Sequence, residues 1–275
     1  MHNALFDALG INAAYLPYAP EPDDLGFAVE GFRAMKFRGA NVTIPYKTQI
    51  GKYLDEISPL SQLCNSVNTL YWKDGIVGGT LCGTTTDPYG CINNLIEHGV
   101  NLRGKHIAIL GNGGAAMALA LSLSKIANEI TIVCRSKKRA NPLINNLNSL
   151  MNYLFLKDGI PFKQIYLRTF DEFYLYSDEI DIIINATSIG MVPFENISPL
   201  QYYDLNEKHV VMDIVYTPPH TKLLQMAEAK GCKIVTGEGM LVHQGLESFK
   251  KWFPKETENK TNEELTAIMR KGMQG

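Results

Sequence analysis

Short apolar runs alternate along the chain with segments in which apolar residues recur every three or four positions. In the second half, the runs have the length and composition of buried strands, and helical patterns separate most of them. Such an alternation is typical of a parallel sheet with helices packed on it, so we expect a doubly wound α/β sheet. The strands are predicted at 105–110, 129–134, 181–185, 210–215 and 233–236.

The first third of the chain has a more mixed pattern. Residues 14–17 and 39–43 are predicted to be strands, and 24–35 carries apolar residues at helical spacing. Two further apolar runs, 66–71 and 76–81, flank a turn sequence and therefore predict a hairpin.

Two other segments give local signals. Residues 136–176 contain Asn-Pro, Asp-Gly and Ile-Pro pairs, which favour loops. Thr261-Asn262-Glu263-Glu264 has the form of a capping box, so we expect a short terminal helix after it.

Composition narrows the class of protein. A chain of 275 residues with 45% hydrophobic and 20% charged residues is long enough for two globular domains. A net charge of -2 favours a small-molecule substrate over nucleic acid or a membrane surface. We expect a monomer or a homodimer. The N-terminus lacks a basic signal region, and no apolar run approaches the roughly 20 residues needed to span a bilayer.

The cysteines and histidines do not form metal-ligand patterns. Five cysteines are widely spaced without a Cys-x-x-Cys pair, which indicates neither a disulfide framework nor zinc and fits a reducing cytoplasm. Six scattered histidines show no ligand spacing either. We therefore predict no metal.

A glycine turn follows the predicted strand 105–110. Gly111-x-Gly113-x-x-Ala116 lies between a strand and a helix, where glycines let backbone N–H groups approach a pyrophosphate. An ordinary glycine-rich turn is the alternative. An NAD site usually has an acidic residue after the next strand, whereas this chain has Cys134-Arg135-Ser136-Lys137-Lys138-Arg139. Guanidinium groups offer paired donors to a 2′-phosphate, so NADP is favoured over NAD, although a solvated basic turn has the same composition.

With these motifs in order, the chain resembles the shikimate dehydrogenases, including their quinate-oxidising relatives. The resemblance covers nearly the whole chain and rests on seven segments. They are 39–47 (GANVTIPYK), 66–70 (SVNTL), Thr86-Asp87, the glycine turn, 185–191 (NATSIGM), 213–216 (DIVY) and 237–244 (GEGMLVHQ).

The resemblance implies an N-terminal α/β substrate domain over 1–86, completed by C-terminal helices at 240–275, and a Rossmann-type doubly wound NADP-binding domain over 87–239. It implies an NADP-dependent oxidoreductase of aromatic amino acid biosynthesis or quinate use, which interconverts 3-dehydroshikimate and shikimate by hydride transfer. The catalytic pair would be Lys47 and Asp87, with substrate contacts from Thr43, Asn68, Tyr216 and Gln244. Residues lining the cofactor site would be Gly111, Asn112, Gly113, Gly114, Ala115, Arg135, Ser136, Arg139, Thr187, Ser188, Ile214, Gly237 and Met240.

The catalytic pair also has a local physical context. Lys47 follows Pro45 and is expected in the first turn of a helix, where the helix dipole disfavours its positive charge. Asp87 precedes Pro88 and is expected to cap a helix as well as to bind a hydroxyl. A Lys47–Asp87 pair would oppose the dipole, so the sequence leaves the direction of the pKa shift of Lys47 open.

Two departures from the family pattern keep alternatives open. Thr85-Thr86-Asp87-Pro88 stands where the family usually has Asn-Thr-Asp-Gly. Met1 matches the point just after the family's Ser-x-Ser-Pro segment, so we expect the chain as written to bind NADP and to turn over substrate weakly. A non-catalytic NADP-binding sensor and an oxidoreductase resembling methylenetetrahydrofolate dehydrogenases are the alternatives.

Overall fold

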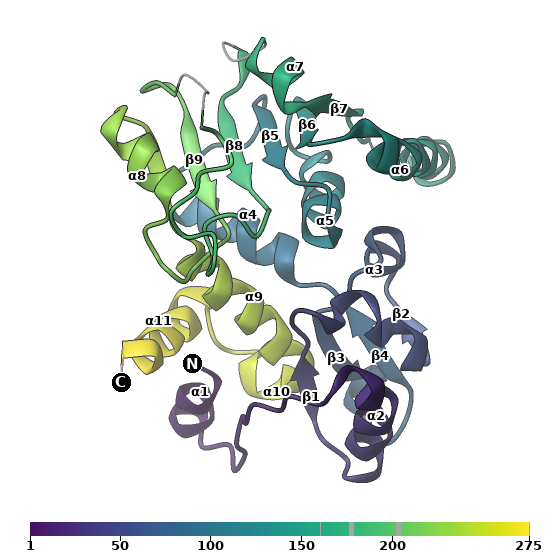
Figure 1. Ribbon diagram of the computed structural model, residues 1–275. Coiled ribbons are helices and arrows are strands. Elements are labelled where there is room, and N and C mark those ends of the chain that lie inside the picture. The colour runs from purple at the N-terminus through teal and green to yellow at the C-terminus, as the bar shows by residue number, and fades with distance from the viewer. Residues whose placement is uncertain (160, 176–178, 202–204, 275) are drawn as a thin grey trace. The chain divides into compact units, whose positions relative to one another are not determined.

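The structure is a computed structural model that describes residues 1–159, 161–175, 179–201 and 205–274, without the side chains of 139, 143, 150, 153–155, 157 and 158. The chain divides into two compact units. Unit 1 comprises Met1–Gly90 and Val242–Gly275, and unit 2 comprises Cys91–Leu241. The divisions fall within helices α4 (Asp87–Glu97) and α9 (Gly237–Trp252) (Figure 1).

Unit 1 contains a four-stranded sheet of order β1-β3-β4-β2. Its strands are β1 (Gly39–Asn41), β2 (Glu56–Ile57), β3 (Thr69–Trp72) and β4 (Leu81–Thr84). β3 pairs antiparallel with β1 and β4, whereas β2 and β4 are parallel. The hairpin predicted from 66–71 and 76–81 is therefore confirmed as β3 and β4, although its second strand begins at Leu81.

The helices of unit 1 come from both its N-terminal and its C-terminal segment. They are α1 (His2–Leu9), α2 (Leu25–Ala34), α3 (Pro59–Cys64), α10 (Pro254–Thr257) and α11 (Asn262–Gln274). Short 3₁₀ turns are η1 (Pro22–Asp24), η2 (Tyr46–Thr48), η3 (Ile50–Tyr53) and η4 (Lys73–Gly75). The capping box before α11 is confirmed, because Thr261 and Glu264 exchange both backbone-to-side-chain hydrogen bonds, at 3.0 and 3.2 Å.

Two apolar clusters hold unit 1 together. In the first, α2 buries Leu25, Val29 and Phe32, which lie on one face at helical spacing. That face packs with Leu70 and Trp72 of the sheet. In the second, the C-terminal part of α9 packs with α1 and α11 through Leu5, Phe6, Leu246, Phe249, Leu265 and Met269. The C-terminal helices thus belong to the same unit as the N-terminal segment.

The strand predicted at 14–17 is wrong. No strand is assigned over these described residues. The backbone N–H of Tyr15 donates to Asn3 Oδ1 at 2.6 Å, and its carbonyl accepts from Asn3 Nδ2 at 3.2 Å. An amide side chain thus satisfies the two backbone groups that a neighbouring strand would bind.

Unit 2 is built on a six-stranded parallel sheet of order β10-β9-β8-β5-β6-β7. Its strands are β5 (His106–Leu110), β6 (Glu129–Cys134), β7 (Ile165–Thr169), β8 (Ile182–Asn185), β9 (Val210–Asp213) and β10 (Lys233–Val235). The strand order reverses between β5 and β8, as in a Rossmann fold, and ligands bind at the carboxyl ends of the strands at such a point. All five strands predicted for this region are confirmed.

Helices pack along the whole sheet of unit 2. α5 (Gly114–Leu123) contacts β5 and β6, α8 (Lys222–Ala229) contacts β9 and β10, and α6 (Lys137–Asp158) and α7 (Phe170–Tyr174) contact β7 (Figure 1). The prediction of loops over 136–176 is therefore wrong over α6, β7 and α7, whereas 161–164 do form a loop, and residues 160 and 176 lie outside the described residues. Pro142 lies inside α6, yet Ala140, Ile144, Leu147 and Met151 are buried at helical spacing, so apolar burial sustains the helix past the Asn-Pro pair.

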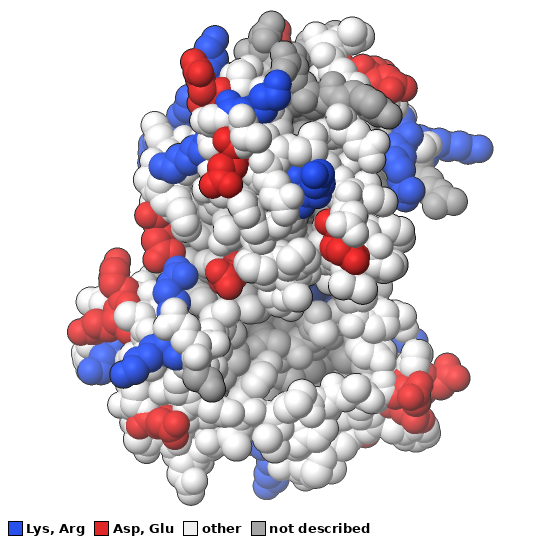
Figure 2. All heavy atoms as spheres, turned by 60° about the vertical axis from the view of Figure 1, so that its left-hand side comes forward, with Lys and Arg blue, Asp and Glu red and all other residues white. Residues whose placement is uncertain are grey.

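Four further observations concern surface charge, thiols, membrane-spanning helices and metal ligands. Lys and Arg side chains lie among Asp and Glu on the face in Figure 2, in keeping with the net charge of -2. All five cysteines are buried free thiols. Among the described helices, none is long and apolar enough to cross a membrane. No group of three potential metal ligands occurs among the described residues.

Candidate active site

A partly buried ion pair lies between η2 and the start of α4 in unit 1. Lys47 Nζ lies 2.7 Å from Asp87 Oδ2. The lysine side chain is 25% exposed and that of Asp87 only 6%. The lysine side chain is thus partly accessible while the carboxylate is held inside, an arrangement suited to moving a proton to or from a bound molecule.

The local structure around this pair differs from two expectations. Lys47 lies in a 3₁₀ turn of three residues, which is too short to supply the dipole of an α-helix. Asp87 is the first residue of α4, and the carbonyl of Thr86 accepts from the N–H of Gly90, so Thr86 takes the capping place that we predicted for Asp87. Both oxygens of the Asp87 carboxylate are instead engaged by side chains, those of Lys47 and Asn68.

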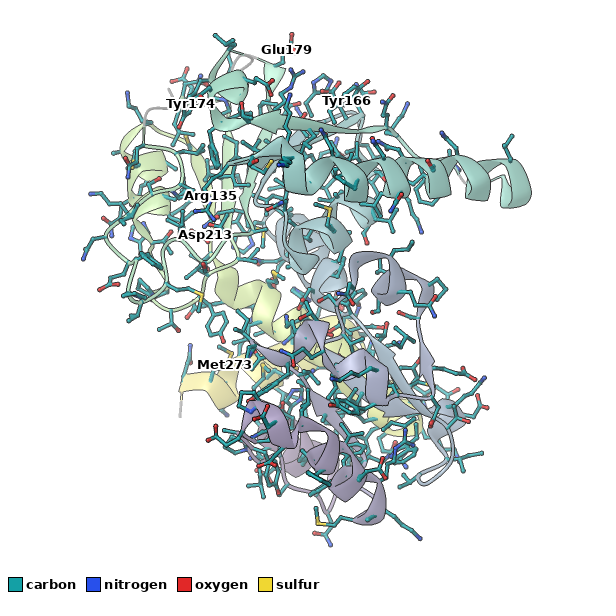
Figure 3. The ribbon with its side chains drawn as sticks, turned by 45° about the vertical axis from the view of Figure 1, so that its right-hand side comes forward. Arg135, Tyr166, Tyr174, Glu179, Asp213 and Met273 are labelled. Carbon is teal, nitrogen blue, oxygen red and sulfur yellow. The ribbon has the colours of Figure 1, made fainter. Side chains whose placement is uncertain are left out.

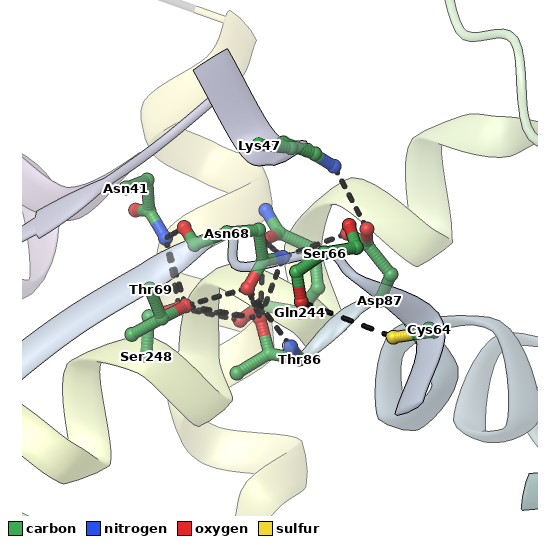
Figure 4. A network of polar contacts seen from close by, with 10 residues as sticks. All are labelled: Asn41, Lys47, Cys64, Ser66, Asn68, Thr69, Thr86, Asp87, Gln244 and Ser248. Carbon is green, nitrogen blue, oxygen red and sulfur yellow. Dashed lines mark hydrogen bonds and ion pairs between the residues drawn. The ribbon is translucent and has the colours of Figure 1, made fainter. Parts of the chain in front are cut away.

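Asn68 fixes the second oxygen of Asp87. The backbone N–H of Thr86 donates to Asn68 Oδ1 at 2.9 Å, which identifies the oxygen of this amide because an N–H only donates. Asn68 Nδ2 must then face Asp87 Oδ1, 2.7 Å away. It also lies 3.3 Å from Gln244 Oε1 on α9 (Figure 4). The structure therefore brings together Lys47, Asp87, Asn68 and Gln244.

Four more polar residues surround this group and were not among the predicted site residues. Asn41, Thr69, Thr86 and Ser248 join Asn68 and Gln244 in one network (Figure 4). The first three occur in the segments that carry the family resemblance. Ser248 lies one helical turn after Gln244, and only that spacing could have suggested it.

Cys64 lies beside the network at the end of α3. Its Sγ lies 3.9 Å from the carbonyl oxygen of Ser66 (Figure 4). Burial raises the pKa of this thiol to about 11. Cys64 is therefore protonated near neutral pH and is a poor nucleophile.

Two predicted substrate contacts lie outside the network. Thr43 is exposed, and its carbonyl accepts from the N–H of Tyr46 in the turn that leads to Lys47. Tyr216 belongs to unit 2. It follows β9 in the sequence and is 47% exposed. Their contacts with substrate remain predictions.

The glycine turn of unit 2 has the geometry that a phosphate needs. Gly111 has a φ of 107°, and a Cβ on it would lie 3.0 Å from Thr187 Cγ2. Gly113 caps α5, and a Cβ there would meet no heavy atom within 4 Å. Backbone N–H groups of the first turn of α5, including those of Gly114 and Ala115, have no partner within the helix, and such groups are what a helix N-terminus offers to a phosphate. Asn112 and Gly113 are exposed.

A second polar network stabilises the loop after β8. Asn185 Oδ1 accepts from the N–H and the hydroxyl of Thr187, at 3.0 and 2.7 Å. Asn185 Nδ2 donates to Asp213 Oδ1 at 3.0 Å, and Thr221 Oγ1 donates to Asp213 Oδ2 at 2.7 Å. The N–H and the hydroxyl of Thr187 thus both donate within the protein, and its Oγ1 accepts from the N–H of Ile189 at 3.1 Å. Its expected contact with the cofactor therefore stays a prediction. The neighbouring Ser188 is exposed.

The start of α9 passes close to the end of β9. A Cβ on Gly237 would lie 2.6 Å from the carbonyl oxygen of Val215 and 2.7 Å from that of Ile214, so only glycine permits this approach. Met240 follows in the first turn of α9 and is buried. The predicted cofactor residues Ile214, Gly237 and Met240 therefore belong to one local arrangement.

The basic run after β6 is partly neutralised within the protein. Arg135 and Ser136 directly follow β6 and are exposed. Arg135 is labelled in Figure 3. Lys137 instead forms an ion pair with Glu172, and this pair holds the pKa of Glu172 below its usual range. The side chain of Arg139 lies outside the described residues. Arg135 is therefore the described cation of this run best suited to a 2′-phosphate.

Comparison with known proteins identifies the family. The family model described as "Shikimate dehydrogenase substrate binding domain" matches residues 1–70. A shikimate dehydrogenase (NADP(+)) of Pyrococcus abyssi is 40% identical over 252 residues, which are 92% of this chain and 85% of that protein. This chain belongs to the shikimate dehydrogenase family. Another member, from Alkaliphilus metalliredigens, is 37% identical over 256 residues, 92% of this chain and 85% of its own.

Solved structures of the family share the fold. A shikimate dehydrogenase in complex with NADP+ has a TM-score of 0.82 at 36% identity, covering 98% of this chain and 89% of that chain. Shikimate 5-dehydrogenase from Listeria monocytogenes, in complex with shikimate and NAD, has a TM-score of 0.80 at 34% identity with the same coverage. The Rossmann-type sheet and the α/β unit before it are thus those of the shikimate dehydrogenase family.

Proposed function

We propose that this chain is an NADP-dependent shikimate dehydrogenase, which interconverts shikimate and 3-dehydroshikimate with Lys47 and Asp87 as its catalytic pair. The observation that carries the proposal is the Lys47–Asp87 ion pair at 2.7 Å, held by Asn68 in a chain of this family. A non-catalytic sensor would have little need of a partly exposed lysine paired with a buried carboxylate.

The partial exposure of Lys47 and the burial of Asp87 indicate how the pair moves a proton. In the reduction direction, the Lys47 ammonium group donates a proton to the substrate oxygen as negative charge develops there. Asp87 lies against that ammonium group and stabilises the positive charge until the proton leaves. In the oxidation direction, Lys47 receives the proton of the substrate hydroxyl. Asn68 and Gln244 orient the ring by hydrogen bonds from the same network.

We infer that unit 2 binds NADP and unit 1 binds the substrate, close to the expected divisions at 86 and 240. When bound, NADP supplies the hydride acceptor for oxidation, and its reduced form supplies the donor for reduction. The turn Gly111–Gly114 and the start of α5 would hold the pyrophosphate. Arg135 would contact the 2′-phosphate, and this contact is the basis for a preference of NADP over NAD.

The five buried free thiols support action in a reducing compartment such as the cytoplasm. A shikimate-like hydroxy acid is the small-molecule partner that we propose. We propose a monomer or a homodimer, and a measurement of the mass in solution distinguishes the two.

Turnover tests the proposal directly. NADP reduction is followed by absorbance with shikimate and quinate supplied separately, and shikimate is expected to be oxidised. Lys47→Ala is expected to lower kcat by about 10²–10⁴ because a general acid–base group is lost. Asp87→Asn is expected to lower kcat too, since the amide retains the shape of the carboxylate and lacks its charge.

A nearby lysine provides the matched control. Lys52 is exposed on η3, with its Nζ 4.8 Å from the centre of the Tyr53 ring. Lys52→Ala is expected to leave kcat unchanged. Binding of NADP without turnover of either acid would favour the sensor, and full turnover by Lys47→Ala would remove the catalytic role of the pair.

A further inference from the structure

A chain of hydrogen bonds lies behind Asn68, on the side away from Lys47. The Tyr15 hydroxyl donates to Asn41 Oδ1 at 3.1 Å, and Asn41 Nδ2 donates to Ser248 Oγ at 2.8 Å. Ser248 Oγ and Thr69 Oγ1 lie 2.7 Å apart, and Thr69 Oγ1 donates to Asn68 Oδ1 at 2.8 Å. The side chains in Figure 4 thus connect Asn41 to the Asp87 carboxylate.

The direction of these bonds follows from groups that can only donate or only accept. Asn41 Nδ2 lies 3.3 Å from the carbonyl oxygen of Asn68, which only accepts, so the oxygen of the Asn41 amide must face Tyr15. The two short contacts of Thr69 are both hydrogen bonds only if Ser248 donates to Thr69 and Thr69 donates to Asn68. Every bond of the chain then points toward Asn68.

Within this series of hydrogen bonds, Ser248 of α9 is the residue that contacts Thr69 of β3. It is fully buried, and its Oγ also lies 3.3 Å from Thr86 Oγ1. The carbonyl oxygen of Gln244, 3.1 Å away, competes with Thr69 for the one hydroxyl hydrogen of Ser248, and Thr69 at 2.7 Å is the nearer acceptor. Aligned hydrogen bonds polarise one another in a buried site. An Asn68 amide whose oxygen accepts strongly is a better donor from its nitrogen, which lies against Asp87.

We propose that Ser248 is a positioning residue of this enzyme, which acts through Thr69 to hold the Asn68 amide against the Asp87 carboxylate. The inference rests on the proposed function, because the effect on turnover presupposes that Asp87 and Lys47 are catalytic. Ser248 itself touches neither reacting group. The competing explanation is that the Ser248 hydroxyl donates to the Gln244 carbonyl within α9 instead of to Thr69, and only adds stability.

Matched variants separate the two explanations. Ser248→Ala is expected to lower kcat about five- to tenfold, the effect of losing one neutral hydrogen bond in the aligned chain. Thr257→Ala is the control, because Thr257 is a buried residue of unit 1 whose hydroxyl donates to the Phe253 carbonyl at 2.9 Å, away from the network. It is expected to lower the unfolding temperature similarly and to leave kcat unchanged. Ser248→Thr, which keeps the hydroxyl, is expected to recover most of the lost kcat.

A double substitution tests whether Ser248 acts through Asn68. In the Asn68→Ala background, Ser248→Ala is expected to lower kcat less than twofold, since the group it positions is already gone. An undiminished five- to tenfold loss there would overturn the proposal. So would a kcat of Ser248→Ala equal to that of Thr257→Ala.

A spectroscopic measurement makes the test independent of turnover. The side-chain amide of Asn68 gives a pair of ¹⁵N–¹H signals that are identified by their loss in Asn68→Ala. These signals are expected to shift in Ser248→Ala and to stay in place in Thr257→Ala, and equal spectra of the Asn68 amide in all three proteins would overturn the proposal. Absence of shikimate oxidation by the unsubstituted protein would instead refute the proposed function.

Discussion

The stability of unit 1 is expected to depend on the protonation of a buried histidine. His2 lies on α1 with its ring centre 4.4 Å from that of Tyr15 and 5.2 Å from that of Trp252. Burial lowers the pKa of His2 from 6.5 to about 4, with a further contribution from the Met1 amino group and a smaller opposing one from Asn41. The imidazole is therefore neutral in the folded protein at pH values at which the unfolded chain binds a proton.

The sign and size of the effect follow from this difference. Since the unfolded chain binds the proton more tightly, the free energy of unfolding falls as the pH drops from 6.5 toward 4. At about 1.36 kcal/mol per pKa unit, the full loss is on the order of 3 kcal/mol. Roughly 2 kcal/mol of it is expected between pH 7 and pH 4.5.

Urea unfolding at pH 7 and pH 4.5 measures this loss in the unsubstituted protein and in His2→Leu. The variant lacks the titrating ring, so its loss between the two pH values is expected to be smaller by roughly 2 kcal/mol. Phe6→Leu is the control, because it changes the same apolar cluster without removing a titrating group. It is expected to lower stability equally at both pH values. The same pH dependence in His2→Leu and in the unsubstituted protein would refute the reasoning.

Two further predictions concern unit 2. Arg135→Ala is expected to weaken NADP binding by about 1.5–3 kcal/mol with little change for NAD, because only NADP carries the 2′-phosphate. Calorimetric titration with both cofactors checks this, and equal losses would contradict the placement of the phosphate. Burial raises the pKa of Asp213 above 3.8, so the folded protein binds this proton more tightly and stability falls as the pH rises through that raised pKa. Asp213→Asn is expected to remove this pH dependence, as measured by urea unfolding. Asp213→Ala is expected to lower the free energy of unfolding by about 1–3 kcal/mol, because it leaves the N–H of Val215 and the hydroxyl of Thr221 unpaired. If the stability of Asp213→Asn depended more steeply on pH than that of the unsubstituted protein, the direction assigned to the pKa shift of Asp213 would be contradicted.

The sheet of unit 2 could be predicted from the sequence because its signals are local. A parallel strand buried on both faces is a continuous apolar run, and β5 and β8 are such runs. The glycine turn after β5 is equally local, since a positive φ at Gly111 and the start of a helix within three residues need no distant partner.

Elements that depend on distant partners were predicted poorly. The apolar residues at 14–17 suggested a strand, but a strand needs a neighbour, and Asn3 binds the backbone of Tyr15 instead. Pro142 suggested a break, yet the burial of one face of α6 outweighs the loss of a single backbone hydrogen bond.

For the site, the sequence by itself supplied the residue types and the family resemblance, and thus Lys47, Asp87, Asn68 and Gln244. Only the tertiary structure decided how they are held. Asn68 and Gln244 are 176 positions apart, and their contact exists because α9 returns to unit 1. The same packing brings Ser248 against Thr69, 179 positions away. Hydrogen bonds act over about 3 Å in space and carry no trace in sequence spacing, so no local pattern could reveal that link.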